Sequence, residues 1–141
     1  MTHCMKLYDK VRIDHFRGFD EYWSVPYGDE TAENGKWEKG PGMKLIKAIS
    51  QAIGDKKIIA EDLGVKIPEV VEVLEKSGFP GMKVLQFAFS PKEESEYLPH
   101  NCPKRSVIYT GTHDNDTSLG WMKTASKEEL SMAKVYLGTS G

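Results

Sequence analysis

The sequence has little cysteine, no excess of positive charge and no long hydrophobic run. Its two cysteines, Cys4 and Cys102, lack the CxxC spacing of metal and redox motifs, which indicates free thiols in a reducing compartment. A net charge of −2 gives no basic surface for nucleic acid. No apolar run has the length of a signal peptide or a bilayer span. We therefore expect a soluble, cytoplasmic protein with no nucleic-acid or membrane partner.

Metal and phosphate motifs are missing as well. The histidines His3, His15, His100 and His113 show no ligand spacing, and no glycine-rich phosphate loop occurs. We therefore expect no metal and no cofactor. Hydrophobic residues make up 39% of the 141 residues, which is enough for a folded domain with a core.

The hydrophobic pattern predicts an α/β fold. Apolar runs typical of buried strands occupy residues 7–14, 57–62, 82–89 and 106–112. Amphipathic helical patterns occupy residues 42–54, 67–78 and 126–138, the last with a capping box of Ser126 and Glu129. Alternating strands and helices indicate right-handed βαβ units and a parallel sheet. Residues 24–42 and 90–105 are expected to be long polar loops, with a short helical turn near 20–23.

Acidic residues stand at three of the expected strand ends. Asp14 ends the first run, Glu61 ends the second and Asp114 follows the fourth. In a parallel barrel such strand ends converge on one face. Glycosidic-bond chemistry needs a pair of carboxyl groups, one ionised and one carrying a proton. Arg12 precedes Asp14 by two residues, so both side chains should share a face of the strand and contact one another.

Each of these features also has an ordinary explanation. An aspartate at a strand end is more often a helix cap or a solvated loop residue, and "GTHDNDTS" fits a cap cluster for a helix that includes Trp121. The histidines fit partly buried structural positions. Trp23, Tyr27 and Trp37 either cover the fold or stack on sugar rings through their apolar faces.

Five motifs in a fixed order decide between these alternatives. They are "VRIDHFRGF", "IIAEDLG", "PGMKVLQFAF", "YLPHN" and "YTGTHDNDT". Together they closely resemble the 4-alpha-glucanotransferases called amylomaltases or disproportionating enzymes, a family of the alpha-amylase clan. The resemblance runs from about Leu7 to Trp121.

The resemblance implies roles for individual residues. Asp14 matches the nucleophile, Glu61 the general acid/base and Asp114 the acid that stabilises the transition state. Arg12 and His113 match residues that line the subsite of the reacting glucose. Further substrate-binding candidates are His15, Asp62, Gln86, Phe87 and Asn115.

The implied reaction is retaining transfer of alpha-1,4-glucan segments to the 4-hydroxyl of glucose or another glucan, without a cofactor. The implied fold is a partial (β/α)8 TIM barrel, with strands four to seven in a single segment over residues 1–141 that is incomplete at both ends. We therefore expect weak or no activity from the isolated chain, and self-association through its open sheet edges. Two alternatives remain: a retaining alpha-glucan hydrolase of the same clan, and a non-catalytic glucan-binding or assembly module.

Overall fold

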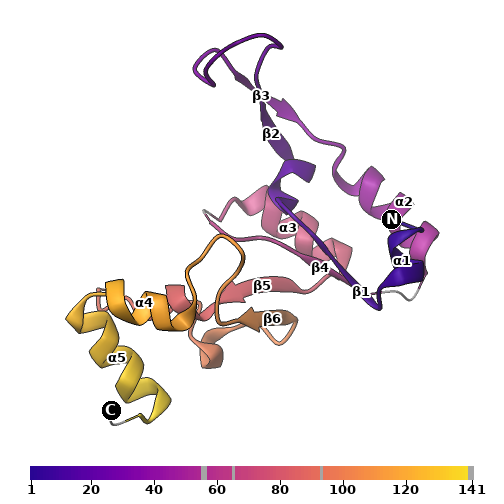
Figure 1. Cartoon of the computed structure of the whole chain (residues 1–141). Helices are drawn as coiled ribbons and strands as arrows, with labels where there is room; N and C mark the ends of the chain where they lie inside the picture. Colours follow the sequence, from indigo (N-terminus) through magenta and orange to yellow (C-terminus); the bar gives the residue numbers. More distant parts are fainter. Residues whose placement is uncertain (55–56, 65, 93, 140–141) are drawn as a thin grey trace. The chain divides into compact units, whose positions relative to one another are not determined.

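The computed structural model describes residues 1–54, 57–64, 66–92 and 94–139. It is a mixed α/β structure (Figure 1). The helices are α1 (Cys4–Leu7), α2 (Gly42–Ile53), α3 (Pro68–Ser77), α4 (Ser118–Thr124) and α5 (Lys127–Leu137). The strands are β1 (Lys10–Ile13), β2 (Glu21–Ser24), β3 (Lys36–Lys39), β4 (Lys57–Ala60), β5 (Gly81–Val84) and β6 (Ser106–Tyr109). Single 3₁₀ turns are η1 (Phe16–Phe19), η2 (Leu85–Phe87) and η3 (Pro99–Asn101).

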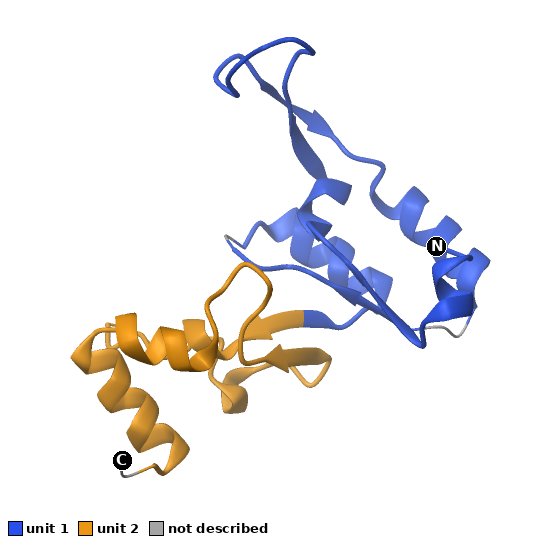
Figure 2. Ribbon diagram, in the orientation of Figure 1, with its two compact units in different colours: residues 1–81 blue, residues 82–141 orange. Residues whose placement is uncertain are grey.

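The chain forms two compact units, residues 1–81 and 82–141 (Figure 2). In the first unit β1 pairs in parallel with β4, from Lys10 opposite Lys57 to Ile13 opposite Ala60. This pairing confirms the expected parallel contact between the first two predicted strands. Neither strand exceeds four residues, so the ladder is short and its stability depends on the helices packed against it.

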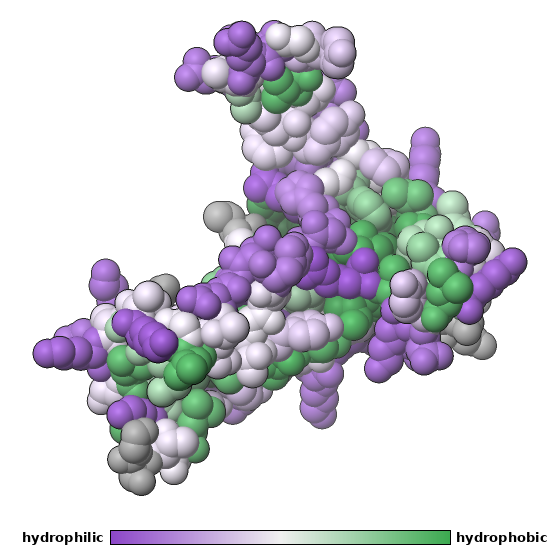
Figure 3. Space-filling view, in the orientation of Figure 1, coloured by the Kyte–Doolittle hydropathy of each residue, from purple (hydrophilic) through white to green (hydrophobic). Residues whose placement is uncertain are grey.

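Two hydrophobic clusters support that ladder. One contains Met5, Ile49, Ile53 and Ile58, and the other contains Phe16, Ile46, Ala60 and Val70. The amphipathic helix α2 contributes to both clusters, because Ile46, Ile49 and Ile53 recur at helical spacing on one face. Figure 3 shows hydrophobic side chains gathered around β1, α1 and α2. The turn after β1 is therefore anchored by Phe16, which is almost completely buried.

The segment after Phe19 differs from the prediction. Residues 20–23 were expected to form a helical turn and residues 24–42 a loop, but β2 and β3 form an antiparallel hairpin (Figure 1). The base of the hairpin closes where Gly40 donates its backbone N–H to Asp20 O at 2.6 Å. A Cβ atom at Gly40 would lie 2.5 Å from the carbonyl oxygens of Gly18 and Phe19, so the close approach requires glycine.

The second unit holds β5 from Met82 onward, together with β6, α4 and α5. The strand expected over residues 82–89 ends at Val84 and continues as the η2 turn, in which Ala88 bonds back to Leu85 O at 3.0 Å. The described strands pair in twos, β1 with β4, β2 with β3 and β5 with β6, and not as one four-stranded sheet. The hydrophobic core of the second unit consists of Ala88, Phe89, Leu98 and Ala133.

Helix α5 follows its prediction closely. The capping box is present: Ser126 Oγ accepts from Glu129 N at 3.2 Å, and Glu129 Oε2 accepts from Ser126 N at 2.8 Å. Gly138 ends the helix with φ 67°. Cys4 and Cys102 are free thiols, and burial raises the pKa of the Cys102 thiol. Within the described ranges, no helix has the length and hydrophobicity needed to cross a bilayer.

Candidate active site

Asp14 and Glu61 follow directly on the last paired residues of β1 and β4. Ile13 lies opposite Ala60 in the parallel ladder. The backbone contact continues past the strand ends, because Glu61 N donates to Ile13 O at 2.9 Å and Phe16 N donates to Glu61 O at 3.0 Å. The two acids therefore belong to neighbouring strand ends at the carboxyl edge of one ladder, as the sequence predicts for this pair.

The carboxylate of Glu61 is oriented by two backbone donors. His15 N donates to Glu61 Oε2 at 2.8 Å, and Leu63 N donates to Glu61 Oε1 at 2.8 Å. His15 adopts the left-handed conformation, with φ 47° and ψ 54°. Among the described residues it is the one non-glycine residue with positive φ. A strained backbone conformation that is held in place by the surrounding structure is typical of functional positions.

Asp14 is held from its own strand. Arg12 Nη2 contacts Asp14 Oδ1 at 2.7 Å, which agrees with the prediction that alternate residues share a face of the strand. The Asp14 side chain is 69% exposed and the Arg12 side chain 27%. The carboxylate is thus oriented by a guanidinium and still open to a ligand.

A cavity of about 170 Å³ adjoins Glu61. The residues lining it are His15, Arg17, Glu61, Asp62, Leu63, Gly64 and Val70. The structure therefore brings three of the candidate residues, His15, Glu61 and Asp62, together in one cavity.

Arg17 is a site residue that the sequence analysis missed. Its Cζ lies 4.5 Å from the centroid of the Trp37 ring, and its Nη2 contacts Glu21 Oε1 at 3.2 Å. The available signal was its position in "RIDHFRG", three residues after Asp14. The sequence could not reveal that the same side chain reaches the hairpin.

The second unit gathers another set of candidates. A cavity of about 450 Å³ is lined by Gln86, Phe87, Ser90, Asp114, Asn115, Asp116, Trp121, Thr124 and Glu129. Gln86 Nε2 donates to Asp116 O at 2.8 Å, and Phe87 lies edge-on to Tyr97 with ring centroids 5.6 Å apart. Four of the candidates, Gln86, Phe87, Asp114 and Asn115, thus share this cavity.

Asp114 does not cap a helix. Its backbone N donates to Thr112 Oγ1 at 3.3 Å, and its Oδ1 lies 3.3 Å from His113 Nε2. Asn115 Oδ1 accepts from both Thr112 N and Thr112 Oγ1 at 2.9 Å. The cap of α4 is instead Thr117, whose Oγ1 accepts from Gly120 N at 3.1 Å. The cap explanation for Asp114 and Asn115 is therefore wrong, and both residues line the cavity.

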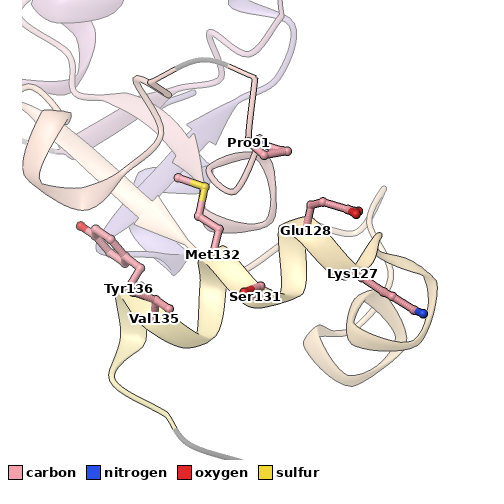
Figure 4. Close-up of a pocket in the computed structure, with 7 residues that line it drawn as sticks. All are labelled: Pro91, Lys127, Glu128, Ser131, Met132, Val135 and Tyr136. Carbon is pink, nitrogen blue, oxygen red and sulfur yellow. The ribbon is translucent and has the colours of Figure 1, made fainter.

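A larger hollow of about 630 Å³ lies on α5 and contains none of the candidate residues. It is lined by Pro91, Lys127, Glu128, Ser131, Met132, Val135 and Tyr136. Figure 4 shows the α5 side chains on successive turns, with Pro91 across from them. Within the part of the chain that the structure describes, no group of three or more His, Cys, Asp or Glu side chains is arranged to hold a metal ion.

Two carboxyl groups thus stand at neighbouring parallel strand ends, with an arginine contacting one and backbone N–H donors contacting the other. Comparison with known proteins names the family. The sequence model of 4-alpha-glucanotransferase matches residues 1–141, and the chain belongs to that family. The family resemblance and the α/β class predicted from the sequence are therefore confirmed.

Two curated relatives define the extent of the match. The 4-alpha-glucanotransferase of Clostridium butyricum is 59% identical over 133 residues, which is 94% of this chain and 27% of the relative. The chloroplastic/amyloplastic enzyme of Arabidopsis thaliana is 52% identical over 141 residues, which is 100% of this chain and 24% of the relative. The chain thus spans about a quarter of the length of these relatives.

A solved structure agrees with the sequence relatives. The amylomaltase of Streptococcus agalactiae in complex with acarbose matches with a TM-score of 0.87 and 38% identity. The match covers 96% of this chain and 28% of that protein. The described fold is therefore that of a portion of an amylomaltase.

Proposed function

We propose that this chain carries the catalytic carboxyl groups of a 4-alpha-glucanotransferase. The reaction is retaining transfer of an alpha-1,4-glucan segment to the 4-hydroxyl of glucose or of another glucan. The observation that carries the proposal is the position of Asp14 and Glu61, directly after opposed residues of the parallel β1–β4 ladder. The match to an amylomaltase in complex with acarbose supports a glucan-like ligand.

The reaction proceeds in two displacements. In the first, the Asp14 carboxylate attacks the anomeric carbon, the glycosidic carbon–oxygen bond breaks, and Glu61 gives its proton to the departing oxygen. In the second, Glu61 takes the proton of the acceptor 4-hydroxyl, whose oxygen attacks the same carbon and releases Asp14. Arg12 orients the attacking carboxylate through the 2.7 Å contact. We expect the two carboxyl groups to lie about 5–5.5 Å apart in the competent site.

The remaining roles are proposals that follow the family resemblance. Asp114 stabilises the positive charge of the transition state by binding sugar hydroxyls, and Arg12 and His113 line the subsite of the reacting glucose. Further sugar contacts come from His15, Asp62, Gln86, Phe87 and Asn115. The 69% exposure of Asp14 and the cavity around Asp114 support access for a sugar at each group.

The proposed fold assignment is finer than the α/β class. We assign β1, β4, β5 and β6 to strands four to seven of a (β/α)8 barrel, within a single catalytic segment over residues 1–141. We expect weak turnover from this chain alone, and self-association through unpaired strand edges, which light scattering would detect. A cytoplasmic location stays a prediction, because a chloroplastic relative belongs to the same family.

Trapping of the covalent intermediate tests the proposal without requiring fast turnover. A Glu61→Gln chain is incubated with alpha-maltotriosyl fluoride, whose leaving group needs no proton. We expect intact-mass spectrometry to detect one maltotriosyl group, and peptide mapping to locate it on Asp14. The control carries Asp14→Asn in addition and should stay unmodified. An adduct at another residue, or a folded chain that never reacts, would contradict the proposed nucleophile.

Product analysis then separates the alternatives. Wild-type chain with maltotriose should yield glucose and a series of longer maltooligosaccharides, at a low rate. A hydrolase would yield only shorter sugars. A chain that binds maltooligosaccharides but forms neither products nor adduct would be the non-catalytic module.

A further inference from the structure

The hairpin β2–β3 presents two indole rings on one face. Trp23 lies directly opposite Trp37 in the antiparallel register. Their ring centroids are 5.4 Å apart with an interplanar angle of 70°. Although the rings contact each other, Trp23 is 41% exposed and Trp37 is 51% exposed. Neither the catalytic proposal nor the hydrophobic clusters accounts for so much exposed aromatic surface.

The indole pair is held in place before any ligand arrives. Trp23 Nε1 donates to Ala32 O at 2.9 Å, across the connection between the strands. A Cβ atom at Gly35 would lie 2.2 Å from Trp23 Nε1, so the backbone packs directly against the indole. Lys39 Nζ contacts Asp20 Oδ2 at 3.3 Å at the base of the hairpin. The conformational entropy that the two indole side chains lose when a ligand binds should therefore be small.

Arg17 connects this face to the cavity beside Glu61. Its guanidinium lies over the Trp37 ring with Cζ 4.5 Å from the centroid. The same residue lines the cavity that contains Glu61 and Asp62. The aromatic face and the candidate catalytic cavity are thus neighbours that share one side chain.

The size of the cavity requires a second surface for a long substrate. Its volume is about 170 Å³, whereas pockets that enclose a drug-sized ligand measure roughly 300–1,000 Å³. A glucan of several units must therefore lie mostly outside this cavity. Sugar rings have apolar faces that stack on aromatic side chains and hydroxyls that bond to charged groups. The hairpin face offers both, because Glu21 and Lys39 flank the indoles in the same register.

We propose that the Trp23–Trp37 face, with Arg17 at its inner end, binds a segment of alpha-glucan that extends away from the Glu61 cavity. This inference rests on the proposed function, because it assumes that the cavity takes a glucan. In this proposal, Trp37 is the contact that makes longer glucans bind more tightly than short ones.

Tyr22 provides a matched control within the same hairpin. It is an aromatic residue of β2, it is 40% exposed, and it lies next to Trp23 in sequence and so on the opposite face. Its hydroxyl donates to Glu38 Oε2 at 3.2 Å. A Tyr22→Leu variant removes a similar amount of exposed aromatic surface without touching the indole pair.

The experiment is a calorimetric titration of the 141-residue chain with maltotriose and with maltoheptaose, in the Glu61→Gln background so that the sugars are not consumed. We expect maltoheptaose to bind more tightly than maltotriose. Trp37→Leu should weaken maltoheptaose binding by about tenfold, the order expected for the loss of one aromatic contact, and maltotriose binding by less than about twofold. Tyr22→Leu should leave the dissociation constants of both sugars within about twofold of the unsubstituted values. Trp37→Phe should recover most of the affinity for maltoheptaose that Trp37→Leu loses.

The outcomes that overturn the inference are distinct. Equal weakening of both sugars by Trp37→Leu would mean a general structural effect, which circular dichroism would also detect. No effect of Trp37→Leu on maltoheptaose binding would mean that the Trp23–Trp37 face is not a sugar site. Failure of the trapping reaction with the length dependence intact would instead refute the catalytic proposal and leave this binding face standing.

Discussion

The backbone N–H of His15 donates a hydrogen bond to Glu61 Oε2 at 2.8 Å, although 46 positions separate the two residues in the chain. His15 directly follows Asp14, so the turn that presents the candidate nucleophile also orients the candidate acid/base. The left-handed backbone of His15 points its N–H toward Glu61. Geometry on one strand end therefore controls geometry on the other.

This relationship predicts a difference between two substitutions at position 15. A left-handed conformation costs a residue with a Cβ roughly 1–2 kcal/mol, and glycine escapes most of that cost. We expect His15→Gly to exceed His15→Ala in free energy of unfolding by about 1 kcal/mol. Urea denaturation of both variants measures the difference. Equal stabilities would mean that the turn relaxes when the imidazole is removed.

Arg12→Lys should separate function from stability. The Arg12–Asp14 pair is partly exposed, and such pairs contribute about 0–1 kcal/mol to folding. Lysine keeps the charge but not the planar fork that orients a carboxylate. We expect the rate of maltotriosyl adduct formation to fall by at least about tenfold, while the free energy of unfolding changes by less than about 0.5 kcal/mol. A large loss of stability with an unchanged rate would contradict the positioning role.

Gly120 and Asp116 should be energetically coupled. A Cβ atom at Gly120 would lie 2.1 Å from Asp116 Oδ2, and Asp116 Oδ1 accepts from Thr117 N at 2.7 Å. Gly120→Ala forces the carboxylate away and breaks that bond, which outweighs the usual helical gain from alanine. We expect destabilisation of about 1 kcal/mol for Gly120→Ala in the wild type and a gain in an Asp116→Ala background. A double-mutant cycle from denaturation curves tests this, and additive effects would contradict the steric explanation.

Glu129 should give α5 a pH-dependent stability. The hydrogen bond that Glu129 accepts from the backbone N–H of Ser126 lowers the pKa of Glu129 below its ordinary value of 4.5. Because the folded pKa is depressed, this contribution is complete above pH 4.5 and is lost as pH falls through the folded value.

Denaturation of wild type, Glu129→Gln and Glu128→Gln across acidic pH measures that contribution. Glutamine can still accept from Ser126 N, so Glu129→Gln should lose part of the acid sensitivity without losing the cap. Glu128→Gln removes a carboxylate from the same first turn, outside the capping box, and should retain more of the sensitivity. Identical pH profiles for all three proteins would contradict the assignment.

Features governed by neighbouring residues were predictable. The capping box of Ser126 and Glu129 and the inward face of α2 depend on spacings of three and four residues. Asp14 and Glu61 could be placed at strand ends because each follows an apolar run. Their location at the same edge of one ladder followed from the rule that the carboxyl ends of parallel strands lie on the same side.

The hairpin and the end of β5 were not predictable in the same way. Each hairpin strand has four residues, and a long polar connection separates them, so the alternation is too short to recognise. Its closure depends on Gly40 approaching Asp20. After Val84 the chain turns, and Gln86 bonds to Asp116, 30 positions away. Such contacts join residues whose separation leaves no periodic trace.

The sequence by itself determined which chemical groups stand at the strand ends and which local helices form, because propensity, capping and periodicity act over a few residues. The tertiary structure decided which partners those groups meet: His15 N–H for Glu61, Asp116 for Gln86, and Arg17 for Trp37. The physical reason is that hydrogen bonds and ring contacts act within a few ångströms. Only the folded backbone brings such distant residues within that range.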